Sequence, residues 1–207
     1  MTMIALIDYG ISNLRSVQKA FEHLDTEVTL VDTPDRLTQA DRLILPGVGA
    51  FPAGMKGLQE RGLIEPIKQA VHEGKPLIGI CLGMQLLFES SDEMGETQGL
   101  ALLPGKVTRL GGQSSVVHGL KVPHMGWNQL DAVCEHPLVR DLVSGSYAYF
   151  VHSYAVYPEQ HDIVLATTEY GGPFASIVGR NKVCGLQFHP EKSQAVGLKL
   201  LRNFLSL

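Results

Sequence analysis

The chain is short of charge and of long hydrophobic runs. Charged residues make up 18% of its 207 residues and the net charge is −4, whereas ~25% charged residues are usual in soluble domains. No basic cluster stands out, which argues against a nucleic-acid partner. No apolar run reaches the ~18 residues that a membrane span needs, and no basic segment precedes the first apolar residues. We therefore expect a soluble, cytoplasmic protein with no membrane contact.

Cysteines are also few and widely spaced. Cys81, Cys134 and Cys184 form no C-x-x-C pair, and the sequence contains no H-E-x-x-H motif. A disulfide framework or a structural metal site is therefore not expected, and we predict no cofactor. The length and the 44% of apolar residues suit one α/β domain spanning residues 1–207.

The hydrophobic pattern changes character near residue 90. Before it, strand-like runs alternate with helical periodicity, which predicts parallel strands whose carboxyl ends gather ligands. After it, short strands are separated by turn residues, residues 91–97 are loop-like, and one helix closes the chain. The expected fold is α/β, a mixed and mainly parallel sheet with helices on both faces. The predicted strands are 3–8, 27–31, 43–45, 77–80, 106–110, 121–124, 147–156, 163–168, 175–178 and 183–187, and the clearest helices are 14–24, 63–72, 82–88 and 194–205.

Two glycines flank one cysteine in Gly79-Ile80-Cys81-Leu82-Gly83, between a predicted strand and a predicted helix. This matches a nucleophile elbow with sulfur in place of a hydroxyl, in which the tight turn needs small neighbours. A helix start would favour the thiolate, and the Leu82 N–H would point to a developing oxyanion. The alternative is a buried structural cysteine.

Two further segments lie where the sheet would bring them to the same edge. Pro46-Gly47-Val48-Gly49 is either an oxyanion-binding loop or an ordinary turn between strand and helix. His189-Pro190-Glu191 follows a buried strand, and a His with a nearby carboxylate supplies the base and the orienting group that a thiolate nucleophile needs. A hydrogen-bonded structural histidine is the alternative for His189.

The segments around Trp127 and His152 have two readings each. Trp127, the only tryptophan, lies beside Met125 and Gly126, so it belongs either to the core or to a contact surface. His152 alternates with aromatic residues on a strand. We interpret those aromatics as core, and Ser153 and Tyr154 as residues that line a pocket.

Together these motifs resemble the class I, triad-type glutamine amidotransferases, over the whole chain. Pro123-His124-Met125-Gly126-Trp127-Asn128 and Tyr149-Phe150-Val151-His152-Ser153-Tyr154 are similar to signatures of the glutaminase subunits of imidazole glycerol phosphate synthases, as is Ile7-Asp8-Tyr9-Gly10 with Asn13 and Leu14. Ser12 departs from the glycine common there, which affects the placement of Asn13.

The resemblance implies a Cys-His-Glu triad that hydrolyses glutamine through a glutamyl thioester. Cys81 would be the nucleophile, His189 the base and Glu191 its orienting group, with Val48 and Leu82 donating oxyanion N–H groups. Ammonia would pass to a (β/α)₈-barrel cyclase subunit that makes imidazole glycerol phosphate and an aminoimidazole carboxamide ribotide in histidine biosynthesis. The implied glutamine pocket comprises Gly47, Gly49, Gln85, Ser153 and Tyr154, and the implied partner interface comprises Asn13, Pro123, Met125, Trp127 and Lys192.

Three other functions compete with this one, and a regulatory hypothesis accompanies it. The chain could be the glutaminase of a pyridoxal phosphate or anthranilate synthase, or a non-catalytic binding subunit of the same fold. A general thiol hydrolase or peptidase is a third possibility. We expect the isolated chain to be a poor glutaminase whose Gly47 loop is completed only when a liganded cyclase binds.

Overall fold

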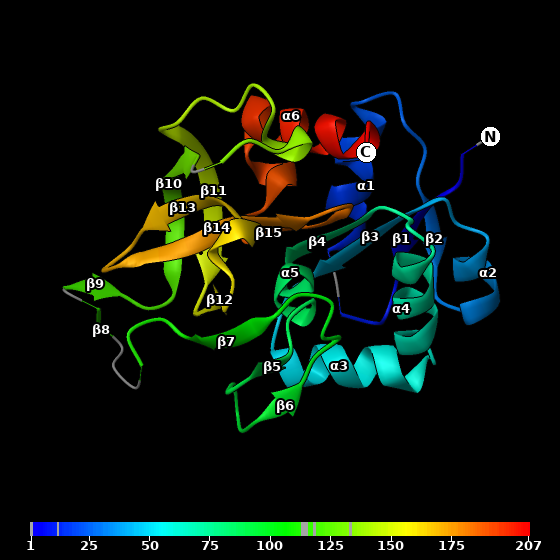
Figure 1. Cartoon of the computed structure of the whole chain (residues 1–207), viewed down its shortest axis with the longest axis horizontal. Coiled ribbons are helices and arrows are strands. Elements are labelled where there is room, and N and C mark those ends of the chain that lie inside the picture. The colour runs from blue at the N-terminus through cyan, green and yellow to red at the C-terminus, as the bar shows by residue number, and fades with distance from the viewer. Residues whose placement is uncertain (1, 12, 113–115, 118, 133) are drawn as a thin grey trace.

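A nine-stranded mixed sheet forms the centre of the described structure (Figure 1). The computed structural model describes residues 2–11, 13–112, 116–117, 119–132 and 134–207. In spatial order the strands of the sheet are β11 (Ser146–His152), β10 (His124–Ala132), β13 (Val164–Glu169), β14 (Pro173–Arg180), β15 (Val183–Leu186), β4 (Leu77–Cys81), β3 (Arg42–Gly47), β1 (Ile4–Ile7) and β2 (Thr29–Val31).

The direction of the strands changes at β15. From β2 to β15 every neighbouring pair is parallel, and from β15 to β11 every pair is antiparallel. This confirms the predicted mixed sheet, with parallel strands from the first half of the chain and antiparallel strands from the second. β4 lies between β3 and β15, so the loops after these three strands emerge at the same edge.

Helices cover both faces of the sheet, as predicted. Phe21 and Leu200, on one face, belong to a core cluster with Ile44 and Ile78 of the strands. A second cluster on the opposite face joins the strands to the remaining helices and to a four-stranded sheet. The first face carries α1 (Leu14–Glu22) and α6 (Gln194–Leu205), and the second carries α2 (Pro34–Thr38), α3 (Phe51–Glu60), α4 (Ile64–His72) and α5 (Leu82–Leu86) (Figure 1).

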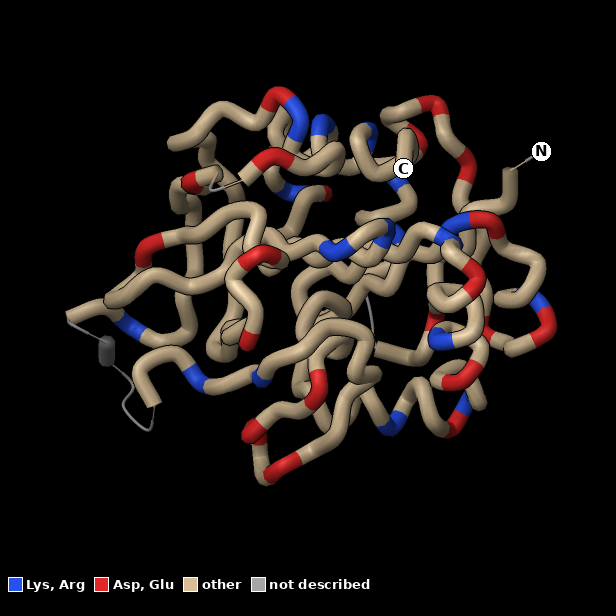
Figure 2. The backbone as a smooth tube through the Cα atoms, viewed as in Figure 1, with Lys and Arg blue, Asp and Glu red and all other residues tan. Residues whose placement is uncertain are grey.

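The smaller elements complete the described structure. The four-stranded sheet has the order β12 (Tyr154–Pro158), β7 (Gly105–Arg109), β5 (Ser90–Ser91) and β6 (Thr97–Gln98), and β8 (Val116–Val117) pairs with β9 (Leu120–Lys121). Three 3₁₀ helices are η1 (Pro137–Val139), η2 (His161–Ile163) and η3 (Pro190–Lys192). Lys and Arg are interspersed with Asp and Glu along the backbone (Figure 2). Among the described residues, every helix is too short or too polar to cross a membrane.

Several predicted elements were wrong in their limits. The strand predicted over 147–156 is two strands, because the chain leaves the large sheet at Ser153, where Leu110 N–H donates to the Ser153 carbonyl, and enters the small one. The strand predicted over 121–124 begins instead at His124 and continues to Ala132. The loop predicted over 91–97 contributes to two short strands, β5 and β6, which pair with each other as a small hairpin, and β5 also pairs with β7.

Candidate active site

Cys81 is the residue at which β4 turns into α5. It ends the strand and caps the helix, with φ 54° and ψ −111°. A positive φ is rare for a residue with a side chain and persists only where the surroundings enforce it, often at functional sites. The predicted nucleophile elbow is therefore present, although α5 ends at Leu86 rather than at Phe88.

The two flanking glycines are needed because backbone segments touch at this turn. A Cβ on Gly83 would lie 1.8 Å from the Leu45 carbonyl oxygen, and a Cβ on Gly79 would lie 2.6 Å from the Gly83 carbonyl oxygen. Both obstacles are backbone atoms, which cannot rotate away as a side chain would. The tight turn at Cys81 therefore requires glycine at positions 79 and 83, because neither position has room for a methyl group.

We expect Gly83→Ala to destabilise the protein by about 3 kcal/mol or more, because the added methyl group overlaps the β3 backbone. The control is Gly54→Ala in α3, where the nearest atoms to the Cβ would be side-chain methyl groups, those of Leu86 at 3.1 Å and one of Leu82 at 3.3 Å. Urea unfolding of both variants measures the difference. Equal stability of the two variants would contradict the steric role assigned to Gly83.

His189 and Glu191 form a buried pair beside Cys81. His189 Nδ1 donates to Glu191 Oε1 at 2.8 Å, and the side chains are 3% and 1% exposed. Burial disfavours the imidazolium, but the Cys81 sulfur and the Glu191 carboxylate outweigh this and raise the pKa of His189 to about 10. Because Nδ1 is committed to Glu191, Nε2 is the nitrogen left for proton transfer with the sulfur.

A serine fastens this pair to the neighbouring strand. Ser193 Oγ donates to the His189 carbonyl at 2.7 Å and accepts the Tyr149 N–H at 3.0 Å. His189 N–H in turn donates to the Tyr149 carbonyl at 3.0 Å. The turn that carries His189 and Glu191 is therefore held to β11 from both sides of Tyr149. The sequence analysis did not identify Ser193, since its partner lies 44 positions away.

A cavity of about 330 Å³ opens at Cys81 and His189. It includes most of the predicted oxyanion and substrate residues and three that were not predicted as pocket residues, namely Glu93, Val151 and His152. Glu93 comes from the loop between β5 and β6, so nothing near it in sequence indicated a site. The predicted residues that line the cavity are Cys81, His189, Val48, Leu82, Gly49, Gln85, Ser153, Tyr154 and, from the predicted interface, Pro123.

The loop after β3 lies beside Cys81. β3 continues through Pro46 to Gly47, which pairs with Cys81, so the loop begins two residues later than predicted, at Val48. The buried Tyr9 hydroxyl donates to the Pro46 carbonyl at 2.6 Å, and a Cβ on Gly47 would lie 2.3 Å from that hydroxyl. Gly47 is therefore packed behind the cavity rather than among its lining residues. Its role as a substrate contact stays a prediction, whereas Val48, 40% exposed, borders the cavity.

Of the predicted interface residues, Met125 and Trp127 lie on β10, Pro123 directly precedes it, and Lys192 of η3 lies over Tyr149 of β11. Met125 and Trp127 are 62% and 47% exposed, which favours the contact-surface interpretation of Trp127 over the core one. The Trp127 ring meets the Tyr149 ring edge-on at 6.0 Å, and Lys192 Nζ lies 5.6 Å from the Tyr149 ring centroid. Asn13 caps α1, which contacts η3 near Lys192. Ser12, the departure from the family pattern, lies outside the described residues.

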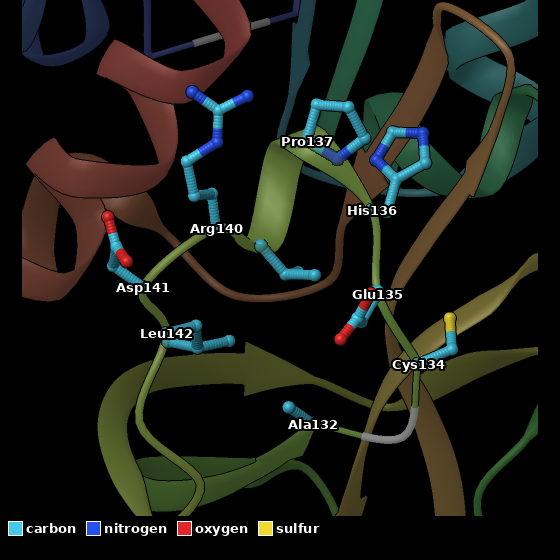
Figure 3. Close-up of a pocket in the computed structure, with 9 residues that line it drawn as sticks. Ala132, Cys134, Glu135, His136, Pro137, Arg140, Asp141 and Leu142 are labelled. Atoms are coloured by element: carbon cyan, nitrogen blue, oxygen red, sulfur yellow. The ribbon is translucent and has the colours of Figure 1, made fainter.

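A larger open pocket of about 700 Å³ surrounds η1 (Figure 3). The cysteine and the histidine that line it are already engaged in hydrogen bonds. The Cys134 thiol donates to the Val164 carbonyl, and burial raises its pKa. Both His136 nitrogens are engaged, Nδ1 by the Leu138 N–H and Nε2 by the Asn181 carbonyl. Among the described residues, no group of three or more His, Cys, Asp or Glu side chains could hold a metal ion.

Comparison with known proteins places this geometry in a family. The family model described as "Glutamine amidotransferase class-I" matches residues 5–207. A solved structure titled "Crystal structure of glutamine amidotransferase" superposes with a TM-score of 0.75 at 22% identity, covering 98% of this chain and 97% of that one. PurLQS from Thermotoga maritima gives 0.74 at 21% identity, covering 100% and 99%. The chain belongs to the class I glutamine amidotransferases.

Within that class the curated relatives are more specific. Imidazole glycerol phosphate synthase subunit HisH of Syntrophotalea carbinolica is 51% identical over 98% of both chains. The subunit of the same name from Salinibacter ruber is 50% identical over 99% of this chain and 94% of that one. The chain therefore groups with the HisH subunits of imidazole glycerol phosphate synthase.

Proposed function

We propose that this chain is the glutaminase subunit of an imidazole glycerol phosphate synthase, acting in histidine biosynthesis, and that Cys81 is its nucleophile. The proposal rests chiefly on one observation: a strained Cys81 and the Glu191-bound His189 face the same cavity. The names of the full-length relatives support the choice of synthase.

In the proposed reaction the Cys81 thiolate bonds to the side-chain amide carbon of glutamine. The tetrahedral intermediate collapses, the C–N bond breaks, and the His189 imidazolium gives its proton to the leaving ammonia. A glutamyl thioester remains. Water then gives a proton to His189 and attacks the thioester carbon, and collapse of the second tetrahedral intermediate breaks the C–S bond, which releases glutamate and restores the Cys81 thiolate and the His189 imidazolium. Glu191 keeps the His189 ring in the orientation that both proton transfers need.

The oxyanion formed in both steps would accept hydrogen bonds from the backbone N–H groups of Leu82 and Val48. The N–H of Leu82, at the first position of α5, has no partner within the helix. Val48 borders the cavity directly after the strand end that pairs with Cys81. Such preorganised donors usually supply a large part of the acceleration in acyl transfer.

The opposite end of the cavity is suited to the amino-acid head of glutamine. Gln85 Nε2 donates to the Tyr154 carbonyl at 3.0 Å and to Gln187 Oε1 at 3.1 Å, so its oxygen is available as an acceptor. Glu93 Oε2 accepts the Phe51 N–H at 2.7 Å. We propose that Glu93 and Gln85 bind the ammonium group, and that Gly49, Ser153 and Tyr154 bind around the carboxylate.

We expect Glu93→Gln to raise the KM for glutamine about tenfold and to change kcat much less, because the lost charge would face the substrate's ammonium group and not the reacting amide. The control is Glu96→Gln, a carboxylate of the same loop that does not line the cavity. Steady-state kinetics at varied glutamine concentration distinguishes the two. A fall in kcat with an unchanged KM would contradict this role for Glu93.

The HisH relatives are subunits of a synthase, which implies a cyclase partner for this chain. We propose a (β/α)₈ barrel that receives the ammonia and docks on the apolar side chains of Met125, Trp127 and Pro123 together with the polar side chains of Lys192 and Asn13. Most free ammonia is protonated at neutral pH and then not nucleophilic, so enclosed transfer preserves its reactivity. The exposed apolar side chains beside the cavity mouth suit such a seal.

The function is tested by measuring glutamate release by the purified chain alone, and then with the cyclase subunit and its nucleotide substrate. We expect weak release alone and strong stimulation by the liganded partner. Full activity of the lone chain would contradict the hypothesis that the Gly47 loop is completed only when a liganded cyclase binds. If no Cys81-dependent release of glutamate occurs while the liganded cyclase is bound, the chain is better described as a non-catalytic subunit.

A further inference from the structure

Two buried histidines outside the triad connect β10 to the cavity. His124 and His152 are 2% and 6% exposed, and His124 Nδ1 lies 3.0 Å from His152 Nε2. His152 Nδ1 lies 2.8 Å from the Tyr154 carbonyl oxygen. His152 also lines the cavity, whereas His124 sits one residue before the exposed Met125. Neither has a part in the proposed chemistry.

The hydrogen bonds at both ends of this pair fix the direction of each proton. A carbonyl oxygen only accepts, so His152 Nδ1 carries a proton that it donates to Tyr154. At the other end, Asn128 Nδ2 lies 3.3 Å from His124 Nε2 and donates to the Glu169 carbonyl at 2.9 Å, while the Asn128 oxygen accepts the Gln129 N–H. Asn128 is therefore the donor and His124 Nε2 the acceptor.

The two ends agree only if both rings are neutral and protonated at Nδ1. His124 Nδ1 then donates to His152 Nε2, and every ring nitrogen has one partner. Burial lowers the pKa of His124 to about 4 and that of His152 to about 3, which is consistent with neutral rings. Without the proton from His124, His152 would be free to carry its proton on Nε2, and it could no longer donate to Tyr154.

We propose that His124 and His152 are positioning residues for the glutamine pocket, His124 by fixing the tautomer of His152 and His152 by holding the Tyr154 carbonyl. This inference rests on the proposed function. The Tyr154 carbonyl also accepts from Gln85, so a single oxygen anchors two parts of the proposed amino-acid subsite. Ser153 and Tyr154 lie where the chain passes from the large sheet to the small one. Neither sheet therefore pairs with both sides of this turn.

The test compares two substitutions of His124. His124→Phe keeps the ring, which stacks between Phe150 at 4.7 Å and Tyr170 at 3.9 Å, but removes the donor. His124→Asn loses the ring but places an amide nitrogen near the former Nδ1. We expect the KM for glutamine to rise about tenfold in His124→Phe, less than threefold in His124→Asn, and kcat to change little in either. A packing role predicts the opposite order.

A second variant tests the same link by rescue. The amide nitrogen of His152→Asn can donate to the Tyr154 carbonyl whatever residue occupies position 124. The double variant His124→Phe with His152→Asn should therefore return the KM to within about threefold of the original. No rise in KM for His124→Phe, a larger rise for His124→Asn, or no rescue in the folded double variant would overturn the proposal.

Nitrogen-15 NMR of histidine-labelled full-length chain provides a readout that is independent of activity. We expect two neutral rings protonated at Nδ1, and loss of the Nδ1-protonated signal of His152 in His124→Phe. An Nε2-protonated His152 in the original chain would overturn the proposal even if glutamine is hydrolysed. Conversely, absence of Cys81-dependent glutamate release would refute the proposed function while the NMR result still decides the tautomer.

Discussion

Replacing Cys81 by alanine is expected to lower the rate of glutamate release by at least about a thousandfold, measured with the cyclase subunit present. Alanine has no atom that can form the thioester, and neither of the other cysteines can take over. Cys184 lies in the core, where burial raises its pKa to about 12, and Cys134 lies outside the cavity. The Cys81 side chain is small and borders a cavity, so its loss should leave the fold intact.

Cys134→Ala is the matched control for this substitution. It removes a thiol of the same chemistry from an exposed position and should leave glutamate release unchanged. Comparable losses in the two variants would mean that Cys81 is not the nucleophile. Residual release above the thousandfold limit in Cys81→Ala would point to direct attack by water and would contradict a thioester mechanism.

The second large effect is expected for Glu191→Gln, which keeps the size of the side chain but removes its charge. The pKa of His189 is raised partly by Glu191, so it should fall toward its ordinary value in the variant. Gln can also present its nitrogen to Nδ1 and select the wrong tautomer of the ring. We expect kcat to fall by about a hundredfold to ten-thousandfold, with KM nearly unchanged.

Glu191→Gln should also change the pH dependence of kcat in a definite direction. A raised pKa keeps His189 protonated to higher pH, and the imidazolium is the acid that protonates the leaving ammonia. Lowering that pKa makes His189 lose its proton earlier, so the alkaline limb of the kcat profile should move to lower pH in Glu191→Gln. A shift of that limb to higher pH, or no shift with an unchanged rate, would show that Glu191 does not act through His189.

The part of the site predicted from sequence is the part that parallel strands bring together. Gly47 and Cys81 are the last residues of β3 and β4, and His189 follows β15. These strands are adjacent, so the alternating pattern and the rule for parallel sheets were enough to predict that the three residues meet. The elbow was equally local, because the two glycines and the cysteine fall within five residues. These features are encoded in short segments.

The features that the sequence did not reveal depend on contacts between distant segments. Glu93 lies in the loop between β5 and β6 and borders the cavity, where it accepts the N–H of Phe51, a residue 42 positions away. The Ser193–Tyr149 hydrogen bond and the His124–His152 contact join residues 44 and 28 positions apart. The break at Ser153 was hidden because the apolar pattern continues from one strand into the next.

The most direct test of the central claim, that glutamine binds with its side-chain amide at Cys81, is modification by a chloroketone analogue of glutamine. We predict that peptide mapping will find the label on Cys81 alone, that glutamine will slow the labelling, and that the liganded cyclase will accelerate it. Labelling of Cys134 or Cys184 at the same rate, or labelling of Cys81 that glutamine does not slow, would contradict the account.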